Sequence, residues 1–214
     1  MTYRAKEHYR DDAVATAYDA ERFTSRKGRF VDHREQSLIR GLIDRAGVRA
    51  PAAIVDIPTG TGRLSMSLAR DGFRVTGVDV SEQMIARAAA RWAAWPQEEQ
   101  PALVVGDAES LPFEDSSFEL VVSLRLLGHL PPETRVRVLR EFRRVSREHV
   151  IVAFYHRTSV QGVVRRRRRG ATPWYPVTLA EIDTELAAAG LRRVARRFML
   201  PFVSETIAVL ARRV

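Results

Sequence analysis

Short apolar runs alternate along the chain with segments in which apolar residues recur every three or four positions. Such runs predict strands buried on both faces of a parallel sheet, and the periodic segments predict amphipathic helices between them. The strands are expected at residues 53–57, 73–78, 102–105, 120–124 and 149–155. The helices are expected at residues 13–23, 32–46, 63–71, 81–95, 133–145 and 179–189. The pattern therefore predicts an α/β fold with a doubly wound, mostly parallel sheet.

Two further apolar segments, at residues 191–200 and 205–212, are separated only by a short turn near Pro201. Sequential strands without a crossover helix pair in antiparallel fashion. We expect them to form a C-terminal hairpin at one edge, which makes the predicted sheet seven-stranded.

The length of 214 residues suits one α/β domain with a full core and is too short for two. We therefore expect a single domain over residues 1–214, with its core at 31–214. Residues 1–30 alternate polar and aromatic side chains, and we interpret them as a lid that brings Tyr18 to a substrate. A helix packed on the sheet edge is the alternative. Residues 156–176 are expected to be a long irregular segment.

The composition is ordinary for a water-soluble globular protein, with 45% hydrophobic and 29% charged residues. No apolar run approaches the roughly 18 residues that a membrane span needs. The absence of cysteine excludes disulfides, thiolate metal sites and cysteine nucleophiles, and the polar N-terminus lacks the apolar stretch of a secretion signal. We expect a soluble, cytoplasmic protein.

The formal net charge is +9, and the run Arg165 to Arg169 is its only locally extreme feature. Because arginine is abundant throughout the chain, the net charge alone does not identify a partner. Three interpretations of the run stay open: a solvated loop, an anion-binding edge of a substrate site, and an RNA-binding patch. The last of these predicts steep salt dependence.

The most informative stretch joins a strand, a glycine-bearing turn, a helix and a second strand between Ala53 and Asp79. Gly60 and Gly62 lack a Cβ, so the turn can adopt positive φ and approach a ligand. The next helix points its N-terminal amides at the same place. Asp79 ends the second strand, where a carboxylate accepts hydrogen bonds from both hydroxyls of a ribose. Together these features predict a site for a nucleoside-containing ligand.

A second motif reads Gly106-Asp107-Ala108, then Leu111-Pro112-Phe113, then Ser117-Phe118. With the glycine turn and the closing hairpin, it resembles the class I S-adenosylmethionine-dependent methyltransferases, in particular the group of ubiquinone and menaquinone biosynthesis methyltransferases. The likeness covers about residue 38 to the C-terminus and implies a Rossmann-like fold. Pro58 departs from the pattern, since it replaces the first of the family's alternating glycines, removes an amide hydrogen and fixes φ.

The resemblance implies S-adenosylmethionine as cofactor and S-adenosylhomocysteine as product. It places Asp79 on the ribose hydroxyls, with Val80 and Met84 beside the adenine. Asp107 and Ala108 would meet the adenine amino group and ring nitrogen. The complete set of implied cofactor-binding residues is Asp56, Pro58, Gly60, Gly62, Asp79, Val80, Met84, Asp107, Ala108 and Leu124. The sequence shows no cluster of His, Asp and Glu at metal-ligand spacing, so we expect no metal.

The candidate catalytic residue is His129, which lies where the family often has a histidine. Methyl transfer is an in-line displacement in which alignment supplies much of the rate, so a base is optional. A histidine there can take a proton from a substrate hydroxyl near neutral pH. Tyr155 and His156, at the end of the fifth predicted strand, face the same edge and are further candidates. A purely structural role is the alternative for each.

The expected substrate is a small molecule that accepts the methyl group on oxygen, nitrogen or carbon, and it is anionic if Arg125 holds it. The predicted substrate contacts are Tyr18, Arg125, His129, Trp174 and Tyr175. Two alternatives stay open. One is an RNA methyltransferase that uses the basic loop 165–169, although a nucleic acid partner is disfavoured. The other is a module that binds S-adenosylmethionine without catalysis.

Overall fold

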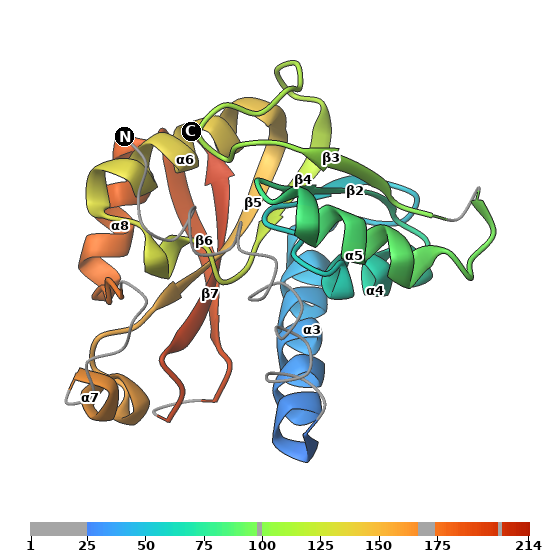
Figure 1. Ribbon diagram of the computed structural model, residues 1–214. Coiled ribbons are helices and arrows are strands. Elements are labelled where there is room, and N and C mark those ends of the chain that lie inside the picture. The colour runs from blue at the N-terminus through green and yellow to red at the C-terminus, as the bar shows by residue number, and fades with distance from the viewer. Residues whose placement is uncertain (1–24, 98–99, 167–173, 201–202) are drawn as a thin grey trace.

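Seven strands form one sheet in the order β3-β2-β1-β4-β5-β7-β6 (Figure 1). The computed structural model describes residues 25–97, 100–166, 174–200 and 203–214. The strands are β1 (Ala53–Asp56), β2 (Arg74–Asp79), β3 (Ala102–Val105), β4 (Phe118–Ser123), β5 (Ser146–Tyr155), β6 (Leu191–Phe198) and β7 (Thr206–Arg213). Strands β1 to β5 pair in parallel, whereas β7 pairs antiparallel to both β5 and β6. The predicted Rossmann-like, mostly parallel fold with a C-terminal antiparallel hairpin is confirmed.

Helices cover both faces of the sheet. They are α3 (Arg26–Ala46), α4 (Arg63–Arg70), α5 (Glu82–Trp92), α6 (Pro132–Val145), α7 (Val160–Arg166) and α8 (Leu179–Ala188), with a short 3-10 helix η2 (Leu127–His129). The strand order reverses between β1 and β4, because β2 and β3 continue on one side of β1 and β5 continues on the far side of β4. Ligands of open α/β sheets bind outside the carboxyl ends of the strands at such a switch point.

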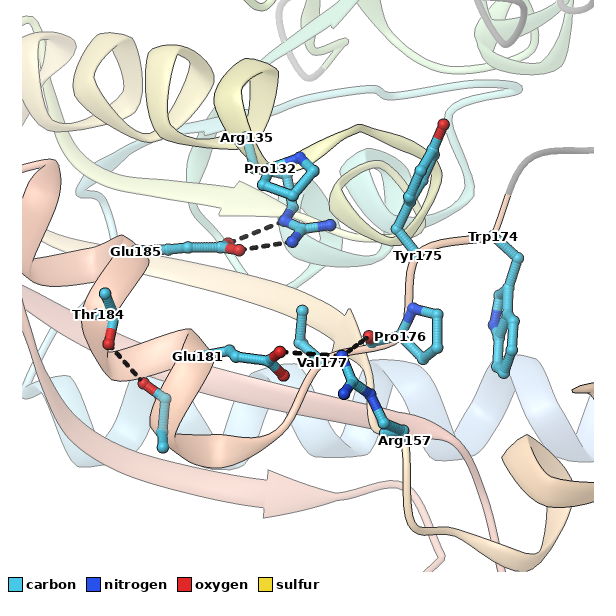
Figure 2. A pocket seen from close by; sticks show the side chains of 11 residues that line it. Pro132, Arg135, Arg157, Trp174, Tyr175, Pro176, Val177, Glu181, Thr184 and Glu185 are labelled. Carbon is cyan, nitrogen blue, oxygen red and sulfur yellow. Dashed lines mark hydrogen bonds and ion pairs between the residues drawn. The ribbon is translucent and has the colours of Figure 1, made fainter.

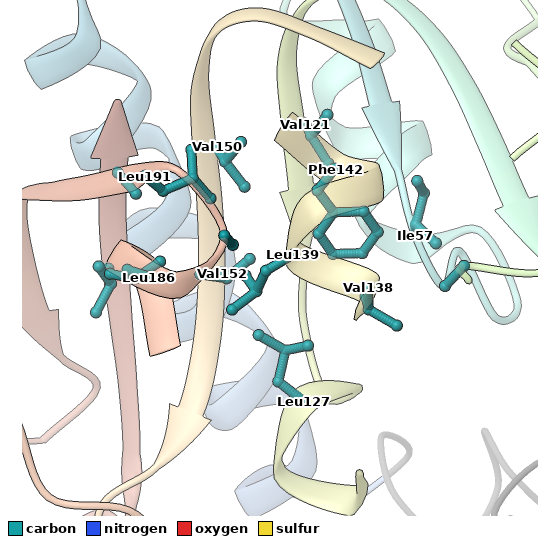
Figure 3. Packing of buried hydrophobic residues seen from close by; sticks show 14 of the residues in the cluster. Ile57, Val121, Leu127, Val138, Leu139, Phe142, Val150, Val152, Leu186 and Leu191 are labelled. Atoms are coloured by element: carbon teal, nitrogen blue, oxygen red, sulfur yellow. The ribbon is translucent and has the colours of Figure 1, made fainter. Parts of the chain in front are cut away.

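The core has two layers, one on each face of the sheet. Alternate residues of β4 belong to different layers: Val121 packs with α6 and α8, whereas Leu120 and Val122 pack with α3 and α4. Figure 3 shows the first layer, where Leu139 and Phe142 of α6 meet the sheet beside Leu186 of α8. This is the period of two that buries both faces of a strand.

Several predictions about where elements lie are wrong. Helix α3 begins at Arg26, not at residue 32, because the Ser25 hydroxyl caps it by accepting a hydrogen bond from the Gly28 amide at 3.0 Å. Residues 26–30 are therefore helical, and the proposed boundary between residues 30 and 31 falls inside a helix. The segment 156–176 is also not wholly irregular, since it contains α7.

Other local predictions are confirmed. Thr178 and Glu181 form a reciprocal capping box at the start of α8, and Gly190, at φ +71°, follows its end. Ser81 caps α5, although this helix ends at Trp92 and not at residue 95. The predicted helix at 13–23, residues 1–24 of the predicted lid and Tyr18 lie outside the described residues. None of the described helices combines the length and the apolar character that crossing a bilayer requires.

Candidate functional site

The glycine turn after β1 has the conformation that only glycine adopts readily. Gly60 and Gly62 have φ of +55° and +76°. A Cβ on Gly62 would lie 2.6 Å from Cζ2 of Trp92, so no side chain fits there. A Cβ on Gly60 would meet no described atom within 4 Å, so the backbone at Gly60 borders open space among the described residues.

Asp79 holds this turn in place. Its Oδ2 accepts a hydrogen bond from the Gly60 amide at 2.9 Å, and its Oδ1 accepts one from the Ser81 amide at 3.0 Å. The side chain is buried, and burial raises the pKa of this carboxyl above its ordinary value. Each carboxylate oxygen has a second lone pair, so Asp79 can still accept hydrogen bonds from a ligand.

Asp56, at the end of β1, is a fully buried acid. The Ser65 hydroxyl donates to its Oδ2 at 2.7 Å, and the Thr59 hydroxyl lies 2.8 Å from that of Ser65. Burial raises the pKa of Asp56 to about 7, with a further contribution from the charge of Asp79. A cation bound beside the turn would favour the ionised form of this acid.

Asp107 lies beside Asp79 at the ends of neighbouring strands. Strand β3 pairs with β2 so that Asp79 is opposite Val105, and the Gly106 amide donates to the Asp79 carbonyl oxygen at 2.9 Å. The Asp107 carboxylate accepts a hydrogen bond from the Glu109 amide at 3.0 Å, and Ala108 is buried. The structure therefore brings the two acids of the predicted cofactor site to one edge of the sheet.

Pro58 interrupts no hydrogen-bond ladder. The amides on either side of it already reach neighbouring strands, from Ile57 to the Val122 carbonyl at 2.9 Å and from Thr59 to the Val78 carbonyl at 2.8 Å. The missing amide of Pro58 therefore leaves the turn anchored on both sides. The peptide bond before Pro58 is cis.

The apolar members of the predicted cofactor site lie around the same edge. Val80 is half-buried directly after β2, and Met84 is buried in the first turn of α5. Leu124 follows β4, where it is half-buried against the core layer of α3 and α4.

His129 and Tyr155 form a pair. The Tyr155 hydroxyl lies 3.1 Å from Nε2 of His129, and the two rings meet edge to face with centroids 5.3 Å apart. Gly128 leaves room for the tyrosine, since a Cβ there would lie 2.2 Å from the Tyr155 ring. His129 is buried, whereas Tyr155 is only half-buried.

His156 is not part of this pair. Its Nδ1 lies 3.2 Å from the Thr158 hydroxyl, and its ring meets Phe198 edge to face. Burial, together with the charge of Arg196, lowers the pKa of His156, so its neutral form is favoured.

Arg125 is bound to another part of the chain. Its Nη2 forms an ion pair with Oε1 of Glu35 on α3 at 2.7 Å, and its backbone has φ of +59°. Glu35 is buried, so this pair joins α3 to the loop after β4. Arg125 thereby has an ion-pair partner within the protein.

Trp174 and Tyr175 lie on the wall of a pocket of about 640 Å³ between α6 and α8 (Figure 2). The Tyr175 amide donates to the Gly128 carbonyl at 2.9 Å, so this wall adjoins the loop that carries His129. Neither His129 nor Tyr155 lines the pocket. The role of Trp174 and Tyr175 as substrate contacts stays a prediction.

Sequence reasoning missed the role of Glu35. Its position relative to Leu38, Ile39 and Leu42 repeats the helical spacing of the buried face of α3, so an acid stands where an apolar residue is expected. An acid among these apolar positions was the sign in the sequence that Glu35 is buried and needs a partner. Within the described ranges, no group of three or more His, Asp and Glu side chains forms a candidate metal site.

Comparison with known proteins places these features in a wider context. A family model described as a methyltransferase domain matches residues 54–149. A demethylmenaquinone methyltransferase from Beutenbergia cavernae is 36% identical over 108 residues, which cover 50% of this chain and 42% of that protein. The chloroplastic magnesium protoporphyrin IX methyltransferase of Arabidopsis thaliana is 30% identical over 118 residues, which cover 55% of this chain and 37% of that protein.

The fold is shared with a solved structure over nearly the whole chain. Magnesium protoporphyrin IX methyltransferase from Synechocystis PCC 6803, with bound SAH, has a TM-score of 0.80 at 18% identity, covering 98% of both chains. The chain spans less than half the length of the two curated relatives. In its motifs and its fold, it resembles the class I S-adenosylmethionine-dependent methyltransferases of the menaquinone type.

Proposed function

We propose that this chain is an S-adenosylmethionine-dependent methyltransferase that transfers a methyl group to a small molecule. The observation that carries the proposal is the meeting of the Gly60–Gly62 turn, Asp79 and Asp107 at one edge of the sheet. The turn borders open space, and both acids accept backbone hydrogen bonds that fix their orientation. This arrangement suits a nucleoside whose polar tail lies over the turn.

The proposed cofactor contacts follow from the chemistry of the donor and acceptor groups. Asp79 accepts hydrogen bonds from the ribose hydroxyls, while Asp107 and Ala108 meet the edge of the adenine between Val80 and Met84. Asp56 is buried beside the glycine turn, and the cationic methionine part would favour its ionised form. S-adenosylmethionine, when bound, supplies an electrophilic methyl group on its sulfonium.

His129 and Tyr155 are the proposed acceptor-side residues. Nε2 of His129 takes the proton of a substrate hydroxyl, directly or through the Tyr155 hydroxyl that lies 3.1 Å away. Tyr155 also orients the histidine ring, because its own ring is held against Gly128. For an acceptor that needs no deprotonation, the pair would position the nucleophile only.

The names of the relatives support a small molecule as the acceptor. Two relatives that match about half of the chain are named as methyltransferases of demethylmenaquinone and of magnesium protoporphyrin IX.

The test is a methyl-transfer screen that detects S-adenosylhomocysteine over a library of phenols, amines, carboxylic acids and quinols. We expect turnover with at least one class, and loss of that turnover in Asp79→Ala. Mixed tRNA in the same screen tests the RNA alternative, which predicts turnover that falls steeply with added salt. Cofactor binding without turnover on any acceptor would favour the non-catalytic binding module.

A further inference from the structure

The pocket between α6 and α8 is separate from the proposed methyl-transfer site. Its volume of about 640 Å³ lies in the range of small-molecule sites. Among the described residues, its lining includes none of the proposed cofactor contacts and neither member of the His129–Tyr155 pair. Arg135 and Glu185, which are buried and joined by two hydrogen bonds, close one side of it (Figure 2).

Most of the lining is apolar, and much of it consists of aromatic and proline rings. The residues that provide this surface are Pro132, Trp174, Tyr175, Pro176, Val177 and Ala180. Aromatic rings and proline rings offer broad faces with few polar atoms, so they favour a planar ligand with a large apolar part. The backbone of this wall is fixed, because the Tyr175 amide donates to Gly128 and the Val177 amide donates to the Tyr155 carbonyl at 2.8 Å.

The carboxylates of the pocket are already engaged. Both oxygens of Glu185 accept hydrogen bonds from Arg135. Glu181 accepts one from Nη2 of Arg157 at 2.9 Å and another from the Thr178 amide at 2.6 Å. Two arginines therefore already balance the charges of the two carboxylates, which disfavours a cationic ligand.

Arg157, in contrast, retains donors. Its Nη2 donates to Glu181 and to the Pro176 carbonyl at 3.2 Å, whereas its Nε and Nη1 make no hydrogen bond within the described ranges. The side chain is 39% exposed, so these donors are accessible to a ligand. A guanidinium with unused donors pairs best with a carboxylate or another anionic oxygen.

We propose that this pocket binds a planar, mainly apolar small molecule that carries an anionic oxygen, with Arg157 as its charged anchor. The site is separate from that of the proposed cofactor, so the two ligands bind together. This inference does not depend on methyl transfer.

The test uses 1-naphthoate as the probe in ligand-observed NMR titrations of the full chain. The wild-type protein should bind it saturably. Ala180→Trp places an indole in the pocket from an exposed position on α8 and should weaken binding at least about tenfold. Ala187→Trp is the matched control, since Ala187 is exposed on the same helix but does not line the pocket, and it should leave binding unchanged.

A second variant tests the anchor. Arg157→Gln should weaken 1-naphthoate about tenfold while leaving the neutral 2-naphthalenemethanol nearly unaffected, because only the anion uses the guanidinium charge. Equal effects of the two tryptophan variants, an equal effect of Arg157→Gln on both probes, or no binding by the wild type would overturn the proposal. Displacement of 1-naphthoate by S-adenosylhomocysteine would also overturn it, since the two sites would then overlap.

Discussion

Asp56 couples the stability of the protein to pH. Burial raises its pKa from 3.8 to about 7 in the folded protein. Between these values the folded chain keeps the proton that the unfolded chain has lost. The contribution of Asp56 to the free energy of unfolding is therefore complete below about pH 4, and it is lost as pH rises to about 7. At 1.36 kcal/mol per pH unit, the loss amounts to at most about 4 kcal/mol.

We therefore expect Asp56→Asn to remove this decline, because an amide does not ionise but can still accept the Ser65 hydrogen bond. Urea unfolding at about pH 5 and about pH 8 measures the difference. Asp183→Asn is the control, since Arg193 lowers the pKa of Asp183 and its ionisation lies below that range. The interpretation fails if Asp56→Asn loses as much stability over the interval as the wild type.

The second residue-scale prediction concerns His129. His129→Ala should leave the affinity for S-adenosylhomocysteine nearly unchanged while lowering turnover. If the histidine is the base, the loss is on the order of 10²-fold and the rising limb of the pH–rate profile disappears. If it only orients the substrate, KM rises and the profile keeps its shape.

Tyr155→Phe separates the two members of the pair, because it removes the hydroxyl near Nε2 and keeps the ring against Gly128. We expect a smaller loss of turnover than in His129→Ala. Wild-type turnover and KM in both variants would show that the pair has only a structural role. The sequence predicted both residues singly, but their contact joins positions 26 apart, which no local pattern reveals.

At the scale of elements, helices and strands were predictable where they bury a face. The strands appeared as apolar runs, and α8 was marked by its capping box. Helix α7 was missed because it buries little: Val160 and Val163 are 59% and 46% exposed, so no apolar period marks them. The first turn of α3 was missed for the same reason, since it is largely polar and exposed and only the Ser25 cap signals it.

The turn between β1 and α4 makes a prediction at this scale. Gly62→Ala would combine a left-handed backbone with a Cβ that lies 2.6 Å from the Trp92 ring. Gly47→Ala has nearly the same φ, +72°, but its Cβ would meet no described atom within 4 Å. We expect a loss of about 1–2 kcal/mol at Gly47 from backbone strain alone, and about 1–3 kcal/mol more at Gly62 from overpacking.

Urea unfolding of the two variants measures this difference. Equal losses would show that contact with Trp92 does not constrain the turn. Gly62→Ala should also weaken the binding of S-adenosylhomocysteine. Gly47→Ala should not, because Gly47 caps the C-terminus of α3 and is not part of the glycine turn.

At the scale of the whole molecule, the alternation of strands and helices was enough to predict the seven-stranded sheet. Parallel strands need crossover helices, and a last pair without one forms an antiparallel hairpin. The pocket between α6 and α8 was not predictable in this way. Its buried ion pair joins Arg135 to Glu185, which are 50 residues apart in the sequence. The pocket exists only because α6 and α8 pack on the same face of the sheet.

The central claim is that S-adenosylmethionine binds at the edge formed by the glycine turn, Asp79 and Asp107. Calorimetric titration of the full chain with S-adenosylhomocysteine tests it most directly, with Asp79→Ala as the variant. Asp183→Ala serves as the control because its carboxylate pairs with Arg193 away from this edge. Saturable binding by the wild type and the control is expected, with affinity about ten- to a hundredfold weaker in Asp79→Ala. Undiminished binding by Asp79→Ala, with its circular dichroism unchanged, would contradict the claim, as would the absence of binding by the wild type.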